Sequence, residues 1–111
     1  MDIEKFIQKW IAAGNAYDTN GYLEKYHKNA VLDDPSVGQS FEGHTGIRKY
    51  FEDYFIGYKT QTRLIKSEIT GDMSAHVEVE FTGEFPEGKI GGIFDLTFKS
   101  GKILSAKADL I

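Results

Sequence analysis

The spacing of hydrophobic residues changes near residue 60, and this change restricts the folds that the chain can adopt. Up to residue 58 apolar side chains recur every three or four residues, whereas from Thr60 onward apolar and polar residues alternate. The alternation is interrupted by residues typical of hairpin turns at Gly71-Asp72, Phe85–Gly88 and Ser100-Gly101. The sequence therefore predicts helices first and then four consecutive antiparallel strands.

The first part of the chain contains three candidate helices. The first begins near Ile3, and its apolar face consists of Ile3, Phe6, Ile7, Trp10, Ile11 and Gly14. A shorter second helix is expected within residues 18–27, where Tyr22, Leu23 and Tyr26 share one side. The third spans residues 43–58, and its apolar face consists of Ile47, Tyr50, Phe51, Tyr54, Phe55 and Tyr58. Each helix therefore has an apolar face that must pack against another element.

Each predicted strand of the meander also has one apolar face. In the second strand Val77, Val79 and Phe81 alternate with His76, Glu78 and Glu80, and in the third Gly92, Phe94 and Leu96 share a face. In the last strand the inner row is expected to be Leu104, Ala106, Ala108 and Leu110. The helices can bury their apolar faces only against this side of the sheet. A short strand is also expected at AVLDDP, residues 30–35. We therefore predict an α+β fold, in which a curved antiparallel sheet, made of this short strand plus the four-strand meander, is packed on one face by three helices.

Small residues interrupt the inner face of the predicted sheet. Gly83, Gly92, Ala106 and Ala108 stand among Phe, Leu and Val residues. A curved sheet covered by helices could therefore enclose a cavity. The alternative is that large helix side chains, such as Trp10, fill this space completely.

Composition excludes several classes of protein. A chain of 111 residues has the length of one domain, so we treat residues 1–111 as a single domain. Cysteine is absent, and the net charge of −4 comes with interspersed acidic and basic residues, so neither a disulfide framework nor a basic surface for nucleic acid is expected. No signal segment, long apolar run, Gly-rich phosphate loop or metal-binding histidine motif is present. We expect a cytoplasmic protein that uses no cofactor or metal and binds neither a membrane nor nucleic acid.

Two adjacent carboxylates in the stretch VLDDPSVG are candidates for a functional site. If this segment forms a strand, Asp34 and Leu32 point to one face and Asp33 to the other, so only one carboxylate can face the interior. An inward carboxylate could act as a general base. The alternative is structural, with Asp34 opening a turn and accepting hydrogen bonds from the backbone N–H groups of Val37 or Gly38. The sequence leaves both roles open.

Four stretches, taken in order, resemble the nuclear transport factor 2-like superfamily, which includes ketosteroid isomerases and SnoaL-type polyketide cyclases. The stretch QKWIAAGNAYD resembles the first helix of that family, and YHKNAVLDDPSVG resembles its Asp-Pro strand. The stretch FEGHTGIRKYFEDYF resembles a later helix, and FDLTFKSGKI resembles the penultimate hairpin. The resemblance covers nearly the whole chain and implies the family's cone-shaped fold. It is less informative about activity, because this fold hosts isomerases, dehydratases, cyclases, hydrolases and binding modules.

The resemblance to ketosteroid isomerases also implies a role for individual residues. In those enzymes the residue before the proline is the base that moves a proton between two carbons of an enone, and that residue corresponds here to Asp34. The tyrosine and aspartate of their oxyanion hole correspond to Trp10 and Phe94, so neither donor is retained. Asp95 would face inward only after a one-residue register shift or a bulge. A tyrosine could replace the lost donors, the candidates being Tyr17, Tyr26, Tyr50, Tyr54 and Tyr58.

The resemblance implies a SnoaL-like protein that binds a small apolar cyclic ligand in an interior cavity, with Asp34 as general base of a ketosteroid-isomerase-like proton transfer. The expected ligand-binding residues are Trp10, Tyr26, Leu32, Tyr54, Phe81, Phe94, Leu96 and Ala106. Two alternatives stay open: a non-catalytic ligand-binding or dimerisation module, and a polyketide cyclase-like or dehydratase-like enzyme. The family also implies a homodimer through the outer face of the sheet. The row of His76, Glu78 and Glu80 on that face is better explained by a solvated or dimer surface than by a metal site.

Overall fold

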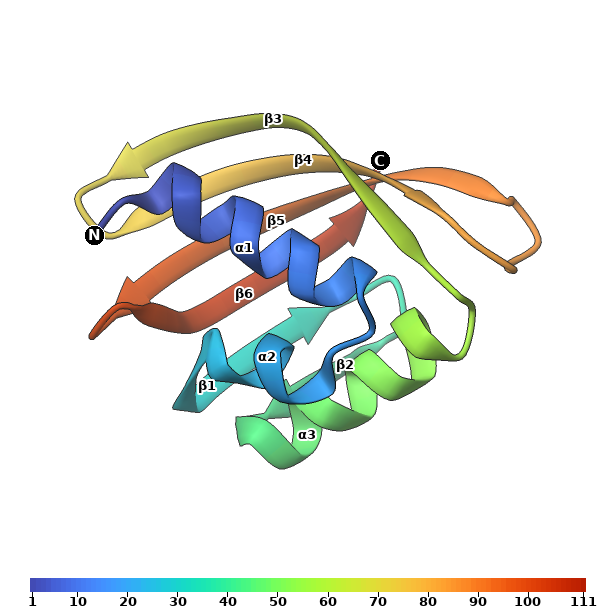
Figure 1. The fold of residues 1–111 in the computed structure, drawn as a ribbon, viewed down its shortest axis with the longest axis horizontal. Coiled ribbons are helices and arrows are strands. Elements are labelled where there is room, and N and C mark those ends of the chain that lie inside the picture. The colour runs from blue at the N-terminus through green and yellow to red at the C-terminus, as the bar shows by residue number, and fades with distance from the viewer.

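The computed structural model describes residues 1–111 and contains three α-helices, one π-helical turn and a six-stranded sheet. The helical elements are α1 (Ile3–Asn15), α2 (Thr19–Glu24), α3 (Gly43–Phe51) and the π-helical turn η1 (Glu52–Ile56). The strands are β1 (Tyr26–Asp34), β2 (Gln39–Glu42), β3 (Gln61–Gly71), β4 (Ser74–Thr82), β5 (Lys89–Lys99) and β6 (Lys102–Leu110). The strand order is β2-β1-β6-β5-β4-β3, and the helices lie together on one side of the curved sheet (Figure 1). The predicted α+β class is confirmed.

The sheet differs from the prediction at the end formed by β1 and β2. β1 pairs in parallel with β6, with Leu32 opposite Ala106, so the expectation of a wholly antiparallel sheet was wrong at this pair. Residues 35–101 separate the two strands along the chain, so no hairpin fixes their relative direction. β1 is also nine residues long rather than short. β2, which pairs antiparallel with β1, was not predicted, because its four residues bury only Phe41 and give no alternating pattern.

Tyr26 lies in a strand and not in the second helix, where its spacing from Tyr22 had placed it. α2 is only six residues long and ends at Glu24, and Tyr26 is the first residue of β1. Tyr22 and Tyr26 are both buried, and their hydroxyl oxygens are 2.9 Å apart. A four-residue spacing between buried residues is typical of a helix, but here a change of chain direction between the two residues brings them together.

The third helical segment is confirmed, although its end is not α-helical. α3 stops at Phe51 and continues into η1, after which the N–H of Thr60 donates to the carbonyl of Phe55 at 2.8 Å. The Thr60 hydroxyl donates to the carbonyl of Tyr54, also at 2.8 Å. Single π-helical turns occur frequently at functional sites, because they alter the direction of side chains along a helix. In this chain the turn carries Tyr54 and Phe55.

The inner row of β6 is shifted relative to the prediction. A bulge between Thr97 and Phe98 places Ile103 opposite Phe98, so that Ile103 is buried and Leu104 is only half-buried. Leu110 was also expected in the inner row, but it is 42% exposed. A single extra residue exchanges the two faces of a strand, and alternation alone cannot reveal it.

The space over Gly92 is filled by a side chain and does not form part of a cavity. The ring of Phe81 lies where a side chain at position 92 would begin. The rings of Phe81 and Phe94 contact each other edge to face, and Trp10 contacts Phe94 in the same way. Around Trp10 and Phe94 the remaining void is about 10 Å³, which is about the space of one water molecule. Around Trp10 and Phe94, large side chains therefore fill the space over the small residues of the sheet, as the alternative to a cavity predicts.

Candidate functional site

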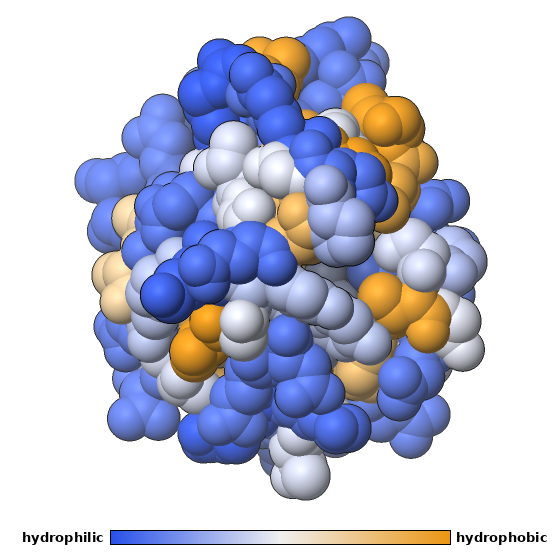
Figure 2. All heavy atoms as spheres, turned by 90° about the vertical axis from the view of Figure 1, so that its right-hand side faces the viewer, coloured by the Kyte–Doolittle hydropathy of each residue, from blue (hydrophilic) through white to orange (hydrophobic).

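A cavity of about 260 Å³ lies between the helical layer and the sheet, next to the filled core, with which it shares Phe55 and Phe81. Its walls come from α3 and η1, from the β4–β5 hairpin, from the turn between β1 and β2, and from the end of β6. Figure 2 looks onto this side of the molecule, where hydrophobic side chains gather beside a hollow. Nine of the fourteen lining residues are hydrophobic. The cavity therefore has the mostly apolar lining with a few polar groups that is typical of small-molecule sites.

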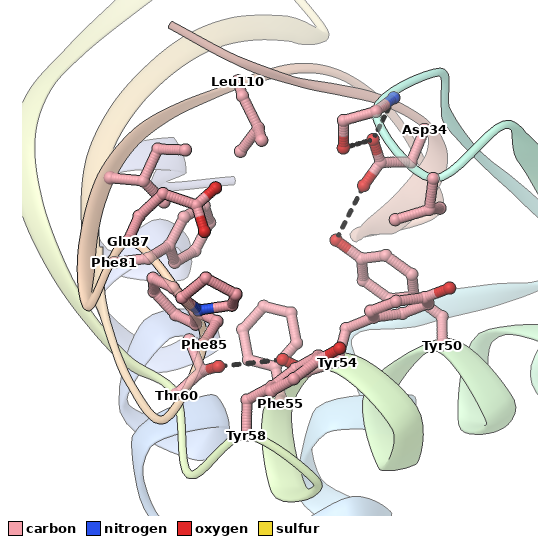
Figure 3. A pocket seen from close by; sticks show the side chains of 14 residues that line it. Asp34, Tyr50, Tyr54, Phe55, Tyr58, Thr60, Phe81, Phe85, Glu87 and Leu110 are labelled. Carbon is pink, nitrogen blue, oxygen red and sulfur yellow. Dashed lines mark hydrogen bonds between the residues drawn. The ribbon is translucent and has the colours of Figure 1, made fainter.

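The cavity has a buried end and an open mouth. Asp34 and Tyr50 lie together on one wall of the cavity and are 6% and 4% exposed, so this wall is its buried end (Figure 3). Tyr58 and Leu110 line its mouth and are 38% and 42% exposed. A ligand entering at the mouth would therefore have its inner end beside a carboxylate.

Asp34 is held by its neighbours through one carboxylate oxygen. Strand alternation places its side chain inward, and it is 6% exposed. Oδ1 accepts hydrogen bonds from the backbone N–H of Ser36, at 3.0 Å, and from the Ser36 hydroxyl. The turn role considered from the sequence is thus present, although the donors belong to Ser36 and not to Val37 or Gly38. It occupies only Oδ1.

The second oxygen of Asp34 is directed toward the cavity. Oδ2 accepts from the Tyr50 hydroxyl at 3.4 Å, which is a long and weak hydrogen bond (Figure 3). Burial, followed by the negative charge of Asp34, raises the pKa of Tyr50 well above its ordinary value. Tyr50 therefore stays protonated and serves as a hydrogen-bond donor. Asp34 can therefore have both of the roles considered from the sequence: Oδ1 stabilises the turn, and Oδ2 is available as a general base.

The structure brings only part of the predicted ligand-binding set together. Asp34, Tyr54 and Phe81 line the cavity. The other six predicted residues, Trp10, Tyr26, Leu32, Phe94, Leu96 and Ala106, are buried in the core and do not line the cavity. These six side chains do point inward, but most inward side chains pack against one another. Ligand binding by any of these residues stays a prediction.

The residues that replace the family's oxyanion-hole donors belong to the filled core. The indole N–H of Trp10 donates to the hydroxyl of Tyr26 at 3.1 Å, and the hydroxyl of Tyr22 is 2.9 Å from the same oxygen. Burial raises the pKa of Tyr26 to about 12 and that of Tyr22 well above its ordinary value. This closed cluster of Trp10, Tyr22 and Tyr26 is therefore neutral, and its donors are directed at one another and not at the cavity.

Of the candidate replacement donors, three tyrosines line the cavity and two do not. Tyr50, Tyr54 and Tyr58 line it, whereas Tyr26 belongs to the closed cluster and Tyr17 accepts a hydrogen bond from Gln61. Of these three tyrosines, only Tyr50 is hydrogen-bonded to Asp34. The third helical segment thus supplies the polar groups that the first helix lacks.

Sequence reasoning missed the contribution of the β4–β5 hairpin. Phe85, Pro86 and Glu87 all line the cavity, and Figure 3 shows the Glu87 carboxylate directed into it across from Asp34. The stretch FPEG was interpreted only as a turn. The available signal was the aromatic residue in this stretch. A turn needs no exposed aromatic side chain, so its presence beside a proline and an acid indicates a function in addition to the turn.

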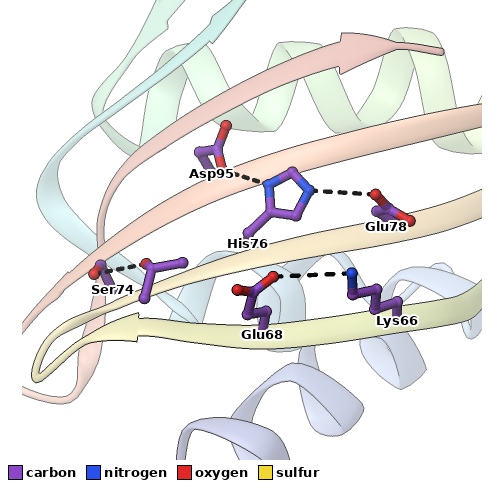
Figure 4. Close-up of polar contacts among 7 residues, drawn as sticks. Lys66, Glu68, Ser74, His76, Glu78 and Asp95 are labelled. Atoms are coloured by element: carbon purple, nitrogen blue, oxygen red, sulfur yellow. Dashed lines mark hydrogen bonds and ion pairs between the residues drawn. The ribbon is translucent and has the colours of Figure 1, made fainter.

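Asp95 lies on the outer face of the sheet and does not replace the missing donor. β4 and β5 pair in regular register with His76 opposite Asp95, so the bulge that would turn Asp95 inward is absent. Asp95 contacts Nδ1 of His76 at 2.6 Å, and Glu78 lies 3.5 Å from Nε2 (Figure 4). The hydrogen bond to Asp95 raises the pKa of His76. No group of three or more His, Cys, Asp or Glu side chains is arranged to hold a metal ion.

Comparison with protein families gives a match over most of the chain. Residues 7–106 match the model of the SnoaL-like domain. The chain belongs to the SnoaL-like domain family. No curated protein matches it in sequence.

None of the helices of this SnoaL-like domain is long and apolar enough to cross a membrane. Its location in the cytoplasm stays a prediction.

Many solved structures share the fold of this SnoaL-like domain. A provisionally assigned polyketide cyclase from Sinorhizobium meliloti is 21% identical, with a TM-score of 0.85 over 94% of this chain and 93% of its own. The epoxide hydrolase/cyclase-like enzyme SalBIII, of pyran ring formation in the polyether salinomycin, is 20% identical, with a TM-score of 0.85 over 97% of this chain and 89% of its own. At these identities the similarity shows the fold alone, which is the nuclear transport factor 2-like, ketosteroid-isomerase-like cone.

A further structure of this fold contains a bound small molecule. A protein from Mycobacterium tuberculosis, solved in complex with estradiol-17beta-hemisuccinate, is 14% identical to this chain. Its TM-score is 0.80 over 93% of this chain and 88% of its own. Proteins with this fold therefore include binders of small molecules.

Proposed function

We propose that this SnoaL-like protein binds a small apolar cyclic molecule in the cavity and that Asp34 accepts a proton from it. The observation that carries the proposal is the position of the Asp34 carboxylate, which is 6% exposed at the inner end of a mostly hydrophobic cavity. Ser36 fixes one oxygen, so the other is oriented toward any ligand. A positioned carboxylate in an apolar environment is the arrangement that general bases use.

The volume of the cavity supports a ligand of one or two rings. An engineered cavity of about 150 Å³ holds benzene. The cavity of this protein, at about 260 Å³, has room for a ring with a substituent or for two fused rings. Its aromatic walls, which include Phe81 and Phe85, suit the flat face of such a molecule.

Tyr50 is the donor that we assign to the charge developing on the substrate. Its raised pKa keeps the hydroxyl protonated, and its bond to Asp34 is long enough to be exchanged for a bond to a ligand oxygen. Tyr50 would thus take the part that Trp10 and Phe94 cannot take, because both lie in the filled core.

The test is turnover of a β,γ-unsaturated cyclic ketone, followed by the absorbance of the conjugated enone. We expect the wild type to isomerise it and Asp34→Asn to lose at least about 100-fold in kcat, the usual contribution of a general base. Asp33→Asn is the matched control, since Asp33 is adjacent but its side chain is on the opposite, exposed side of β1. Equal activity in Asp34→Asn and the wild type, or no activity in either, would exclude proton transfer by Asp34 on this substrate class.

The second candidate is a binding protein without catalysis. It is favoured by the single carboxylate at the inner end of the cavity and by the closed cluster, whose donors bond to one another and not to the cavity. A cyclase-like or dehydratase-like reaction is a third candidate and would use Tyr50 as its second polar group. Ligand binding that survives in both Asp34→Asn and Tyr50→Phe, with no turnover in the wild type, would favour the binding protein.

We also propose that two copies associate through the outer face of the sheet. That face carries His76, Glu78 and Asp95, together with Lys66 of the neighbouring strand (Figure 4). A pair of opposite charges on one face suits a self-complementary contact between identical copies. Sedimentation of the wild type and of a His76→Glu variant, which adds a third acid to the row, would show whether this face forms the contact.

A further inference from the structure

Both charged residues that line the cavity are acidic. They are Asp34 at the inner end and Glu87 at the mouth, and none of the fourteen lining residues is Lys, Arg or His. The lysines nearest in sequence are engaged elsewhere, because Lys59 pairs with Glu84 and Lys89 with Glu80. The charge inside the cavity is therefore negative and is not compensated by the protein.

Asp34 in particular is a buried carboxylate without a cation. It is 6% exposed, and no Lys, Arg or His side chain lies within ion-pair distance of it. Its partners are the N–H and hydroxyl of Ser36 and the distant hydroxyl of Tyr50, all of which are neutral. Buried charges in proteins are normally paired, so an unpaired one facing a cavity indicates that its partner comes from outside.

The aromatic residues of the cavity suit a positively charged partner. The rings of Tyr54 and Tyr58 are stacked with centroids 6.4 Å apart, and Phe85 contacts Tyr58 from the hairpin side at 6.1 Å. Aromatic rings attract ammonium groups through the negative charge of their faces, and a site built of several rings is typical of quaternary ammonium recognition. The same rings attract a neutral apolar ligand, so the charge of the two acids decides between the two ligand classes.

We infer that the ligand of this cavity is a cation, namely a small cyclic or aromatic molecule that carries a protonated or quaternary amine. A neutral ligand would displace water from Asp34 and Glu87 and leave both carboxylates less solvated, which weakens its binding. An anionic ligand would be repelled. An ammonium group between the two carboxylates compensates the lost water and contacts the rings of Tyr54 and Tyr58.

This inference rests on the proposed function, because it assigns a charge class to the molecule bound at the same site. It also agrees with proton transfer to Asp34. A cationic group beside the reacting carbon stabilises the negative charge that develops when the proton leaves, which is a task that no basic residue of the cavity performs.

The test compares two probes of the same shape. Phenyltrimethylammonium and tert-butylbenzene differ only in the atom that carries the three methyl groups, and therefore in charge. We expect the cation to bind about tenfold more tightly than the neutral probe, as measured by chemical-shift titration of the wild type. The preference should fall at least threefold in Asp34→Asn and in Glu87→Gln. Glu84→Gln, on the same hairpin but outside the cavity, should keep it.

The outcomes separate this inference from the proposed function. If both probes bind equally, or if the neutral probe binds better, the cavity binds apolar molecules but the cation inference is overturned. A cation preference that persists in Asp34→Asn and Glu87→Gln also overturns it, because the charge is then recognised elsewhere. If neither probe shifts any cavity resonance, both the inference and the proposed ligand site fail. Glu87 is exposed, so the Glu87→Gln variant tests the idea even if Asp34→Asn does not fold.

Discussion

The two ends of the helix–sheet interface bury polar groups in opposite ways. In the closed cluster, Trp10, Tyr22 and Tyr26 bond to one another, and the void beside them holds about one water molecule. At the open end, Asp34 has one oxygen bonded to Ser36 and the other facing a cavity of about 260 Å³. Mutual hydrogen bonding contributes to stability, whereas incomplete hydrogen bonding leaves capacity for a ligand. In this SnoaL-like fold the closed cluster therefore maintains the structure, whereas the region around Asp34 is available for a function.

The largest difference between the two ends should appear when an aromatic side chain is removed. Trp10→Ala deletes a fully packed ring and should lower the free energy of unfolding by about 3–5 kcal/mol. Tyr58→Ala removes a ring that is 38% exposed at the mouth and should cost about 1 kcal/mol or less. Urea unfolding of the two variants measures both values. Similar losses at the two positions would contradict the division into a structural and a functional end.

A smaller difference is expected when only a hydroxyl group is removed. Tyr26→Phe leaves the buried Trp10 N–H without its acceptor, so the free energy of unfolding should fall by about 1–3 kcal/mol. Tyr50→Phe should cost less than about 1 kcal/mol, because the cavity admits water to Asp34. The comparison fails if Tyr50→Phe is the more damaging of the two in urea unfolding.

Replacement of the carboxylate should scarcely change stability. Asp34→Asn keeps an oxygen for Ser36 and removes a buried charge that has no cation, so we expect the free energy of unfolding to stay within about 1 kcal/mol of the wild type. Thermal unfolding measures this, with Asp33→Asn as control. A loss of several kcal/mol would instead assign Asp34 to the structural part of the molecule.

The smallest effect concerns the ionisation of the buried tyrosines at high pH. Folding raises the pKa of Tyr22, Tyr26 and Tyr50, so the folded state holds protons that the unfolded state loses above pH 10. Their contribution to stability is therefore complete below about pH 10 and decreases as the pH rises further. Asp34→Asn removes a charge that raises the pKa of Tyr50, so this pKa should fall while that of Tyr26 stays at about 12. Titration of tyrosine resonances by NMR distinguishes the two, and equal shifts at both sites would contradict the separation of the two ends.

The parts of the fold that depend on neighbouring residues could be predicted from the sequence. The hydrophobic period of each segment predicts the apolar faces of α1 and α3 and the alternation in β4 and β5. It also predicts the inward direction of Asp34. The errors arose where the pairing of strands decides the structure. Tyr26 joins β1, and the bulge in β6 turns Leu104 away from the inner row, because pairing with other strands outweighs local pattern.

The sequence by itself determined the class of fold, the order of the elements other than β2, and the side of β1 to which Asp34 points. Only the tertiary structure decided that Trp10 and Phe94 fill the core, that Tyr50 is hydrogen-bonded to Asp34, and that Glu87 faces the same cavity from the hairpin. The reason is that periodicity specifies which side chains point inward. Whether an inward side chain fills space or borders a cavity depends on the volumes of side chains that lie far apart in the sequence.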